Sequence, residues 1–370
     1  MAHRMRSLLL SVLLAILVCS QLLAQSDTTP FRVVIAGLTH GHVAGFLEAA
    51  SKRTDIQIVG IAEPDQQLAH RYSAQYKLNP HLLYTDLDEM LTAVKPQAVL
   101  AYTDTLDHRR VVEIAARHHL PVMMEKPLAV SVEDALAIKR AADAGHIPVL
   151  VNYETTWYSS NAEVYQLVET GELGPIRKVV VHDGHQGPKE IAVPPEFLSW
   201  LTDPARNGAG ALFDFGCYGA DLMTWLMHGE SPTSVTAVLQ TFKPQIYSRV
   251  DDEATVILTY PKAQAILQAS WNWPFSRKDM EVYGETGQAI TVGRDLIRLR
   301  RKDEGEEHQQ SAPALSSPYN DPISYLIAVV SGKIEPAGLS ALDTNMTVTR
   351  ILAAARESAR TGKTIRLKAE

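Results

Sequence analysis

The chain has 370 residues, of which 46% are hydrophobic and 21% are charged, and its formal net charge is -7. This composition predicts an ordinary globular protein long enough for two domains, and it excludes a disordered or low-complexity chain. Because the balance is acidic, we expect neither nucleic acid nor an anionic membrane as a partner.

The N-terminus has the features of a secretory signal peptide over residues 1–24. Two arginines precede an apolar stretch at 8–18, and Ala24 offers a small residue for cleavage. An uncleaved membrane anchor is the alternative, because residues 7–24 approach the length of a transmembrane helix. We expect cleavage and a periplasmic or secreted protein without a stable membrane partner. Cys217 is then the only cysteine, so no intrachain disulfide can form.

From residue 30 the pattern alternates between short apolar runs and amphipathic segments. The predicted strands are 31–36, 56–62, 98–102, 121–124 and 148–151, and the predicted helices are 43–53, 66–76, 87–94, 107–118 and 132–144. Apolar strands between amphipathic helices predict a parallel sheet covered on both faces. We therefore expect an α/β protein in which residues 30–151 form a doubly wound Rossmann domain that binds a nucleotide.

Beyond residue 152 the hydrophobic pattern changes to longer alternating stretches. The predicted strands here are 233–242, 254–260, 263–273 and 280–283, and the predicted loops are 187–204 and 302–317. Alternation of this kind is typical of antiparallel strands. Residues 152–370 are expected to form a C-terminal α+β domain with a largely antiparallel sheet.

A glycine-containing loop follows the first predicted strand, where the pyrophosphate of a dinucleotide usually binds. Its residues are Gly37, Leu38, Thr39, His40, Gly41 and His42. The usual spacing is G-x-G-x-x-G, and here Thr39 and His42 replace the second and third glycines. Thr39 can still donate hydrogen bonds, and the helix N-terminus still favours phosphate. The ring of His42 stands where helix and strand should meet, so we expect either a shifted loop or a displaced cofactor.

Glu63 ends the second predicted strand. An acid at this position commonly bonds the ribose hydroxyls of adenosine and repels the extra phosphate of NADP. A solvated acid in a loop is the alternative. We expect NAD rather than NADP.

Five motifs in a fixed order carry a family resemblance. They are Tyr84 to Leu91, Thr103 with His108, Glu125-Lys126-Pro127, Gly210 to Asp221, and Glu357 to Lys363. Together they resemble the Gfo/Idh/MocA oxidoreductases, which act mostly on sugars and cyclitols with NAD or NADP. The branch resembled is the one like glucose-fructose oxidoreductase, with tyrosine at the catalytic position that is histidine elsewhere.

The resemblance implies roles for particular residues. Lys126 inherits a place at both cofactor and substrate, and Asp214 and Tyr218 inherit the other catalytic positions. We expect these two to lie on one helix, where a spacing of four puts them on one face, so that both can reach one substrate. We expect Lys126 to favour the phenolate of Tyr218, so that both act as a pair. The alternatives are a tyrosine packed in the core and an aspartate that caps a helix.

Further positions follow from the same resemblance. The cofactor positions are Gly37, Leu38, Thr39, His40, Gly41, His42, Glu63, Thr103, His108, Glu125 and Lys126; the substrate positions are Asn152, Trp157, His185 and Asp221. The family usually has Thr-Pro where this chain has Thr103-Asp104, and it has an arginine after Asn152 that is missing here. Tryptophans such as Trp157 could stack on a sugar or belong to the core.

Histidine pairs at 40 and 42, 118 and 119, and 182 and 185 suggest metal ligands. A pair without a third ligand is not a site, so we expect no metal.

Three functions remain open. The first is an exported NAD(P)-dependent oxidoreductase that acts on a CH–OH group of a sugar, polyol or sugar derivative. The second keeps the nicotinamide as a tightly bound, recycled group, so that elimination, hydrolysis or internal oxidoreduction of a sugar can follow. The third is a non-catalytic, secreted carbohydrate-binding protein on the same fold. In each case we expect a small-molecule partner and a homo-oligomer formed through the C-terminal sheet.

Overall fold

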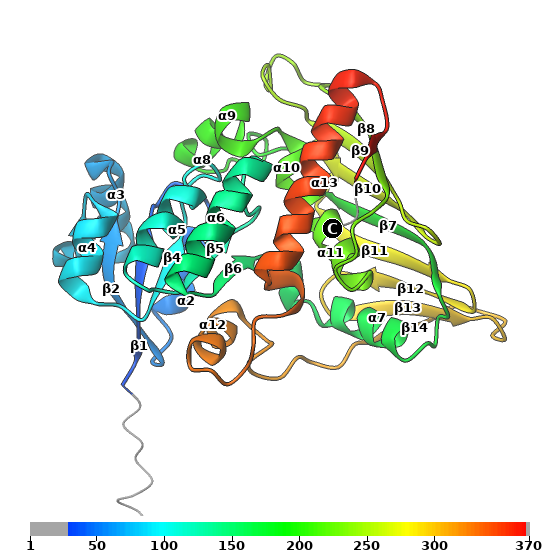
Figure 1. Ribbon diagram of the computed structural model, residues 1–370, viewed down its shortest axis with the longest axis horizontal. Helices are drawn as coiled ribbons and strands as arrows, with labels where there is room; N and C mark the ends of the chain where they lie inside the picture. Colours follow the sequence, from blue (N-terminus) through cyan, green and yellow to red (C-terminus); the bar gives the residue numbers. More distant parts are fainter. Residues whose placement is uncertain (1–28, 368–370) are drawn as a thin grey trace, which may run out of the picture.

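The computed structural model describes residues 29–367, which form two domains side by side (Figure 1). The predicted signal peptide over 1–24 lies outside the described residues. Within 29–367, no helix is both long enough and apolar enough to cross a membrane.

The first domain is built on a six-stranded sheet with the order β3-β2-β1-β4-β5-β6, and every neighbouring pair is parallel. The strands are β1 (Phe31–Ala36), β2 (Ile56–Ala62), β3 (Leu83–Tyr84), β4 (Ala98–Ala101), β5 (Val122–Glu125) and β6 (Val149–Asn152). The order reverses at β1, which pairs with both β2 and β4. Ligands of such sheets bind at the carboxyl ends of the strands beside the reversal. The prediction of a doubly wound parallel sheet is confirmed.

Helices cover both faces of this sheet. They are α2 (Val43–Ala50), α3 (Gln66–Tyr76), α4 (Leu87–Val94), α5 (His108–Arg117) and α6 (Val132–Gly145), with a 3-10 turn η1 (Pro80–Leu82) before β3. Side chains of α4, α5 and α6 belong to one hydrophobic cluster, and those of α2 and α3 belong to another. The second cluster includes Ile323 and Leu326 of α12 (Pro322–Val330), so a helix from late in the chain also covers the N-terminal sheet.

The second domain is built on a nine-stranded sheet with the order β14-β13-β12-β11-β7-β10-β9-β8-β15. Its strands are β7 (Ile176–Gly184), β8 (Ser234–Gln240), β9 (Glu253–Thr259), β10 (Gln264–Ser270), β11 (Arg277–Gly284), β12 (Gly287–Val292), β13 (Leu296–Arg301), β14 (His308–Ser311) and β15 (Ile365–Arg366). The pair β7 and β10 is parallel, and the other neighbours are antiparallel. The prediction of a largely antiparallel sheet is confirmed.

One face of the second sheet is covered by helices (Figure 1). The covering helices are α7 (Ser159–Glu169), α10 (Ala211–Asp214), α11 (Gly216–Leu226) and α13 (Leu342–Thr361), and short turns η2 (Glu154–Trp157) and η3 (Gly338–Ser340) link the two domains. Buried and partly exposed residues alternate along β9 and β10, so the other face of these strands points outward. Oligomerisation through this sheet stays a prediction.

Several predicted segments differ from the structure. The strand predicted at 263–273 ends at Ser270, and the strand predicted at 280–283 runs from Arg277 to Gly284. The helix predicted to reach Arg53 ends at Ala50, because Ser51 bonds back to the carbonyl of Glu48 and the chain turns away. The loop predicted at 187–204 contains a helix, α8 (Pro195–Leu201), and α9 (Pro204–Asn207) begins at its end. The turn predicted at 302–317 contains the edge strand β14.

Candidate active site

The glycine loop connects β1 to α2 at the carboxyl edge of the first sheet. Gly37 has a φ of 81°, and a Cβ there would lie 2.6 Å from Thr103 Cγ2, so this position accepts only glycine without strain. The backbone N–H of Leu38 donates to Glu63 Oε2 at 2.7 Å, and the N–H of His40 donates to the carbonyl of Tyr102 at 2.9 Å. The loop is therefore held from both neighbouring strands.

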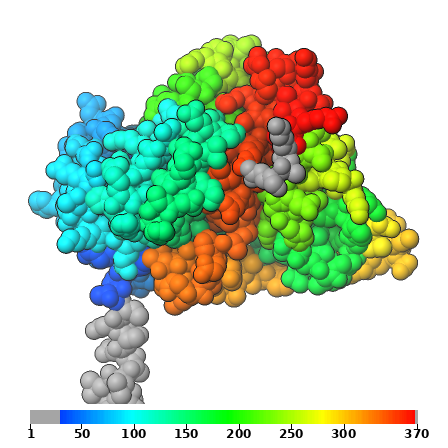
Figure 2. Space-filling view, in the orientation of Figure 1, coloured from blue at the N-terminus to red at the C-terminus, as the bar shows by residue number. Residues whose placement is uncertain are grey.

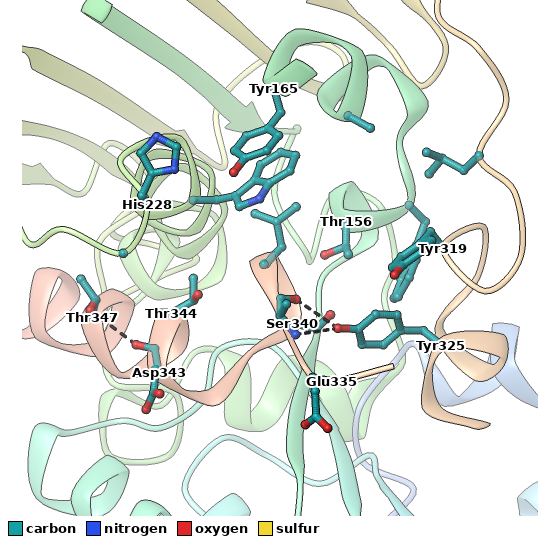
Figure 3. A pocket seen from close by; sticks show the side chains of 18 of the residues that line it. Thr156, Tyr165, His228, Tyr319, Tyr325, Glu335, Ser340, Asp343, Thr344 and Thr347 are labelled. Carbon is teal, nitrogen blue, oxygen red and sulfur yellow. Dashed lines mark hydrogen bonds between the residues drawn. The ribbon is translucent and has the colours of Figure 1, made fainter. Parts of the chain in front are cut away.

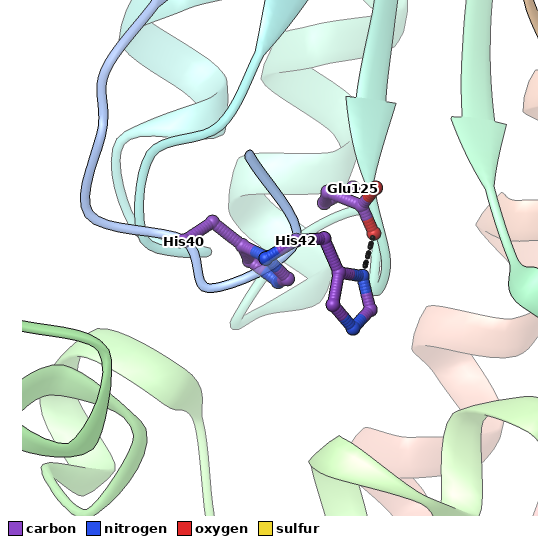
Figure 4. A group of neighbouring side chains, drawn as sticks. All are labelled: His40, His42 and Glu125. Atoms are coloured by element: carbon purple, nitrogen blue, oxygen red, sulfur yellow. Dashed lines mark hydrogen bonds and ion pairs between the residues drawn. The ribbon is translucent and has the colours of Figure 1, made fainter. Parts of the chain in front are cut away.

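The two histidines of the loop take different environments (Figure 4). His42 precedes α2 and turns its ring toward Glu125 at the end of β5, with 2.9 Å between His42 Nδ1 and Glu125 Oε2. His40 is 1% exposed and packs against the rings of Phe197 and Trp200. The predicted crowding between helix and strand does not arise, because the His42 ring contacts Glu125 of β5, and β4 lies between β5 and β1 in the sheet.

A cavity of about 390 Å³ opens at the carboxyl ends of β1, β2 and β4, beside the strand reversal. Gly37, Thr39, Glu63 and Thr103 line it. Both oxygens of Glu63 accept backbone N–H groups, from Leu38 and from Asp65. Burial raises the pKa of Glu63. The alternative of a solvated acid is wrong, because Glu63 is 4% exposed.

Lys126 follows β5 and forms a buried ion pair with Asp214 of α10. Its Nζ lies 2.6 Å from Asp214 Oδ1 and also donates to the Asp214 carbonyl at 2.8 Å. Trp271 Nε1 donates to the second carboxylate oxygen at 2.9 Å. Burial alone would raise the pKa of Asp214, but Lys126 holds it below the usual range; Asp214 in turn raises the pKa of Lys126 against the effect of burial. Both groups are therefore charged at neutral pH.

Tyr218 lies on the next helix, which corrects the expectation of one helix for Asp214 and Tyr218. The helix is interrupted at Phe215, between α10 and α11. Lys126 Nζ lies 5.1 Å from the centre of the Tyr218 ring, over its face, while its hydrogen bonds go to Asp214. The expected lowering of the Tyr218 pKa is also wrong here, because burial raises that pKa well above its usual value.

Sequence reasoning missed a second lysine beside the cluster formed by Lys126, Asp214 and Tyr218. Lys278 of β11 places its Nζ 4.7 Å from the centre of the Tyr218 ring, and it forms an ion pair with Glu154. Burial would raise the pKa of Glu154, but Lys278 lowers it to about 2. Asp183 of β7 is 1% exposed, and neither carboxylate oxygen has a hydrogen-bond partner among the described residues. No local sequence pattern marks Lys278 or Glu154, whereas Asp183 lies between the histidines at 182 and 185.

Two predicted substrate residues connect to Glu125 instead of to Lys126. Asn152 Nδ2 donates to Glu125 Oε1 at 2.9 Å, and Trp157 Nε1 donates to Asn152 Oδ1 at 2.9 Å. His185 does lie near the cluster, with its ring edge-on to Phe215 at 4.8 Å between centres. Burial lowers the pKa of His185.

Two predicted cofactor residues support the loops around the site. His108 is fully buried, and its Nδ1 lies 3.1 Å from the carbonyl of Pro127, so it braces the turn that carries Lys126. Burial lowers the pKa of His108 to about 4. Thr103 lines the cavity and bonds the carbonyl of Asp104 through its hydroxyl.

Asp221, the remaining predicted substrate residue, lies on α11 and is 0% exposed, and its contact with a substrate stays a prediction. Neither carboxylate oxygen has a hydrogen-bond partner among the described residues, and burial raises its pKa well above the usual value. A carboxyl with a raised folded pKa takes up a proton on folding, so its contribution to stability falls as pH rises above the unfolded pKa.

We expect Asp221→Asn to stabilise the protein at alkaline pH by on the order of 1 kcal/mol, because the amide cannot ionise. The gain should vanish in acid, where the carboxyl is protonated in both states. Urea unfolding across the pH range measures this, and an equal effect at every pH would contradict it. If the substitution changed KM and left stability constant, Asp221 would instead be a residue that contacts the substrate.

A helix from the second domain covers the glycine loop. Trp200 of α8 donates from Nε1 to the carbonyl of Thr39 at 3.1 Å, and Phe197 lies against Gly41 and His40. Glu196 accepts from the Tyr72 hydroxyl of α3 at 3.0 Å. Segment 187–204, expected to be a loop, therefore joins the two domains beside the cavity that Glu63 lines.

A larger cavity of about 1140 Å³ lies elsewhere, between α7, α12 and the start of α13 (Figure 3). Trp157, Tyr165, Trp225, Tyr319 and Tyr325 contribute aromatic walls. Lys126, Asp214 and Tyr218 do not line it, so its size does not make it the place of chemistry. Charged groups and perturbed pKa values gather instead at the carboxyl edge of the first sheet.

A Rossmann domain with a glycine loop, a buried acid after β2 and a buried lysine–aspartate pair is typical of nucleotide-dependent oxidoreductases. Residues 31–153 match the model of the oxidoreductase family with an NAD-binding Rossmann fold, and residues 161–290 match the GFO/IDH/MocA C-terminal domain. These segments together make up more than half of the chain. The chain belongs to the Gfo/Idh/MocA family of NAD-binding oxidoreductases.

Two curated relatives are distant from this chain in sequence. The trans-1,2-dihydrobenzene-1,2-diol dehydrogenase of Xenopus tropicalis is 25% identical over 219 residues, which are 58% of this chain and 61% of that protein, so the match spans about three fifths of the relative's length. The scyllo-inositol 2-dehydrogenase (NADP(+)) IolW of Bacillus subtilis is 24% identical over 272 residues, 67% of this chain and 72% of that protein.

Among solved structures, an aldose-aldose oxidoreductase from Caulobacter crescentus, complexed with glycerol, is similar to this chain with a TM-score of 0.77. The two are 23% identical, and the likeness covers 91% of this chain and 100% of that one. At this identity the comparison establishes the fold.

Proposed function

We propose that the protein is an exported NAD-dependent oxidoreductase, which moves a hydride between nicotinamide and a CH–OH carbon of a sugar, polyol or sugar derivative. The buried pair of Lys126 and Asp214 carries this proposal, because it lies at the carboxyl end of β5 beside the glycine loop. The names of the relatives, which act on an inositol and on aldoses, support the substrate class. Reduction of NAD by a panel of sugars tests it.

The described residues fit NAD. The N-terminus of α2 and the backbone of Gly37 and Thr39 would face the pyrophosphate, and the cavity beside them offers Glu63 to a ribose. Bound there, the nicotinamide supplies the hydride acceptor.

Lys126 would hold the reacting oxygen of the substrate. An ammonium group has three donors, and two of them already bond the Oδ1 and carbonyl of Asp214. The third donor remains for a substrate oxygen. Asp214 thus positions Lys126, and Trp271 positions Asp214.

Tyr218 would carry the proton of the substrate hydroxyl. Because burial raises its pKa, the phenol holds its own proton at neutral pH. This form suits donation to a carbonyl oxygen when a ketone is reduced. In the oxidising direction the rate is expected to rise with pH, since the phenol must first lose that proton.

A second candidate keeps the nicotinamide bound through repeated turnovers, so that redox steps assist elimination, hydrolysis or internal oxidoreduction. The cover formed by α8 favours it, because Trp200 bonds the glycine loop itself. Export favours it too, because free NAD is scarce outside the cytoplasm. Bound nicotinamide in the mass spectrum of protein purified without added cofactor would support this candidate over the first.

The cofactor preference is expected to depend on Glu63. Wild-type protein should bind NAD more tightly than NADP. Glu63→Gln should lower the ratio of these two affinities about 10-fold or more, because the substitution removes a buried charge that faces the ribose. Titration calorimetry measures both affinities, with the exposed substitution Glu89→Gln as the control. Tighter binding of NADP by the wild type, or binding of neither, would contradict the assignment.

Export is expected from residues 1–24. Expression of the full chain in a bacterium with two membranes should yield a mature protein that begins near Gln25, outside the cytoplasm. Intact-mass measurement of the periplasmic fraction checks this. A full-length chain retained in the membrane would show that the segment is an anchor.

A further inference from the structure

The sequence places His40 and His42 two residues apart without a third metal ligand nearby, and the fold brings Glu125 beside them. Glu125 lies 83 positions beyond His42 in the sequence, and its Oε2 is 2.9 Å from His42 Nδ1. One ligand atom from each of the three side chains lies within 4.8 Å of the other two. Figure 4 shows the three converging from the glycine loop and the end of β5.

The ring of His40 has a nitrogen that the rest of the fold does not use. His40 is 1% exposed, and its Nε2 has no hydrogen-bond partner among the described residues. Its Nδ1 accepts a long contact of 3.3 Å from the N–H of His42. A shift of the ring proton to Nδ1 would give up that weak contact and expose a lone pair on Nε2.

The carboxylate of Glu125 is oriented by a second hydrogen bond. Asn152 Nδ2 donates to Oε1 at 2.9 Å, which leaves Oε2 directed at His42. Trp157 holds Asn152 in turn. Metal-binding carboxylates and histidines are usually fixed by outer partners of this kind.

We propose that His40, His42 and Glu125 bind one divalent transition-metal cation such as zinc, cobalt or manganese. Two imidazoles and one carboxylate are a common ligand set for such ions, and three protein ligands leave further positions open. The side chain of His42 is 44% exposed, so an oxygen of a bound small molecule can reach those positions. The site adjoins Lys126, which is the next residue after Glu125.

A second cluster among the described residues serves as a comparison. His182, Asp279 and Glu281 also lie within ligand distance of one another. There Arg277 already provides the positive charge, because its guanidinium bonds Asp279 Oδ1 at 2.9 Å and lies 3.3 Å from His182 Nδ1. We expect no cation at this second cluster.

The test uses the full mature chain, stripped with a chelator and then dialysed against zinc, cobalt or manganese ions one at a time. Elemental analysis is expected to find one equivalent of at least one metal in the wild type. His42→Ala and Glu125→Gln should each weaken binding at least about tenfold. The matched control, His182→Ala, should keep the full equivalent. Cobalt adds a visible spectrum that reports coordination by nitrogen ligands, independently of activity.

The variant His42→Ala changes a half-exposed side chain, and its thermal unfolding establishes that the chain still folds. Three results would overturn the proposal. They are no stoichiometric metal in the wild type, equal metal in His42→Ala and wild type, or loss of metal in His182→Ala alone. The first of these would leave His42 and Glu125 as a hydrogen-bonded pair without a metal.

Discussion

Replacing Lys126 with methionine is expected to lower hydride transfer about 100- to 1,000-fold and to destabilise the fold. The rate falls because the substrate oxygen loses its charged donor. The stability falls by about 3–5 kcal/mol because Asp214 stays buried without its partner. Single-turnover kinetics and urea unfolding measure the two effects separately.

The double substitution Lys126→Met with Asp214→Asn separates the two roles of the lysine. It removes both charges, so most of the lost stability should return, while the rate should stay low. The surface substitution Lys139→Met is the control and should change neither quantity. Full activity in a folded Lys126→Met variant would show that the lysine is structural.

Replacing Tyr218 with phenylalanine is expected to lower the chemical step by at least about 100-fold in both directions, because a general acid or base contributes about 100- to 10,000-fold. The substitution keeps the ring against Lys126 and Lys278 and removes only the oxygen. Affinity for NAD should stay nearly unchanged.

Tyr153→Phe is the matched control for this experiment. Tyr153 packs edge-on against Tyr218 at 5.4 Å, but its hydroxyl donates to Asn345, away from the cluster. It should lower stability and leave the rate of hydride transfer nearly intact. An unchanged rate in Tyr218→Phe would place the proton acceptor elsewhere, and Asp214 would be the next candidate.

Local patterns were enough to predict the parts of the site that lie within single motifs. The turn after β1 and the acid after β2 are found where strands end, because strand, turn and helix signals are short-range. The lysine after β5 was singled out by the family motif. The family motif also predicted that Asp214 and Tyr218 lie close together. The motif did not reveal that the helix is interrupted at Phe215, so that Tyr218 belongs to the next helix, α11.

The contacts that sequence reasoning missed join distant segments. Glu154 and Lys278 are 124 positions apart, and Trp200 reaches the carbonyl of Thr39 across 161 positions. Neither has a pattern that a window of 20 residues could detect, because only the packing of the second domain on the first brings them together. The same holds for Glu125 and His42, which looked like unrelated motifs until the sheet placed β1 and β5 on either side of β4.

The most direct test of the account is the absorbance of reduced nicotinamide after NAD-loaded protein is mixed with a panel of sugars and polyols. We predict that at least one compound reduces the cofactor in a single turnover. Deuterium at the reacting carbon should slow that step, and Lys126→Met should slow it about 100- to 1,000-fold. Two results would contradict the proposed oxidoreductase. In the first, NAD binds but no member of the panel reduces it. In the second, the bound NAD is reduced at the same rate in wild type and in Lys126→Met.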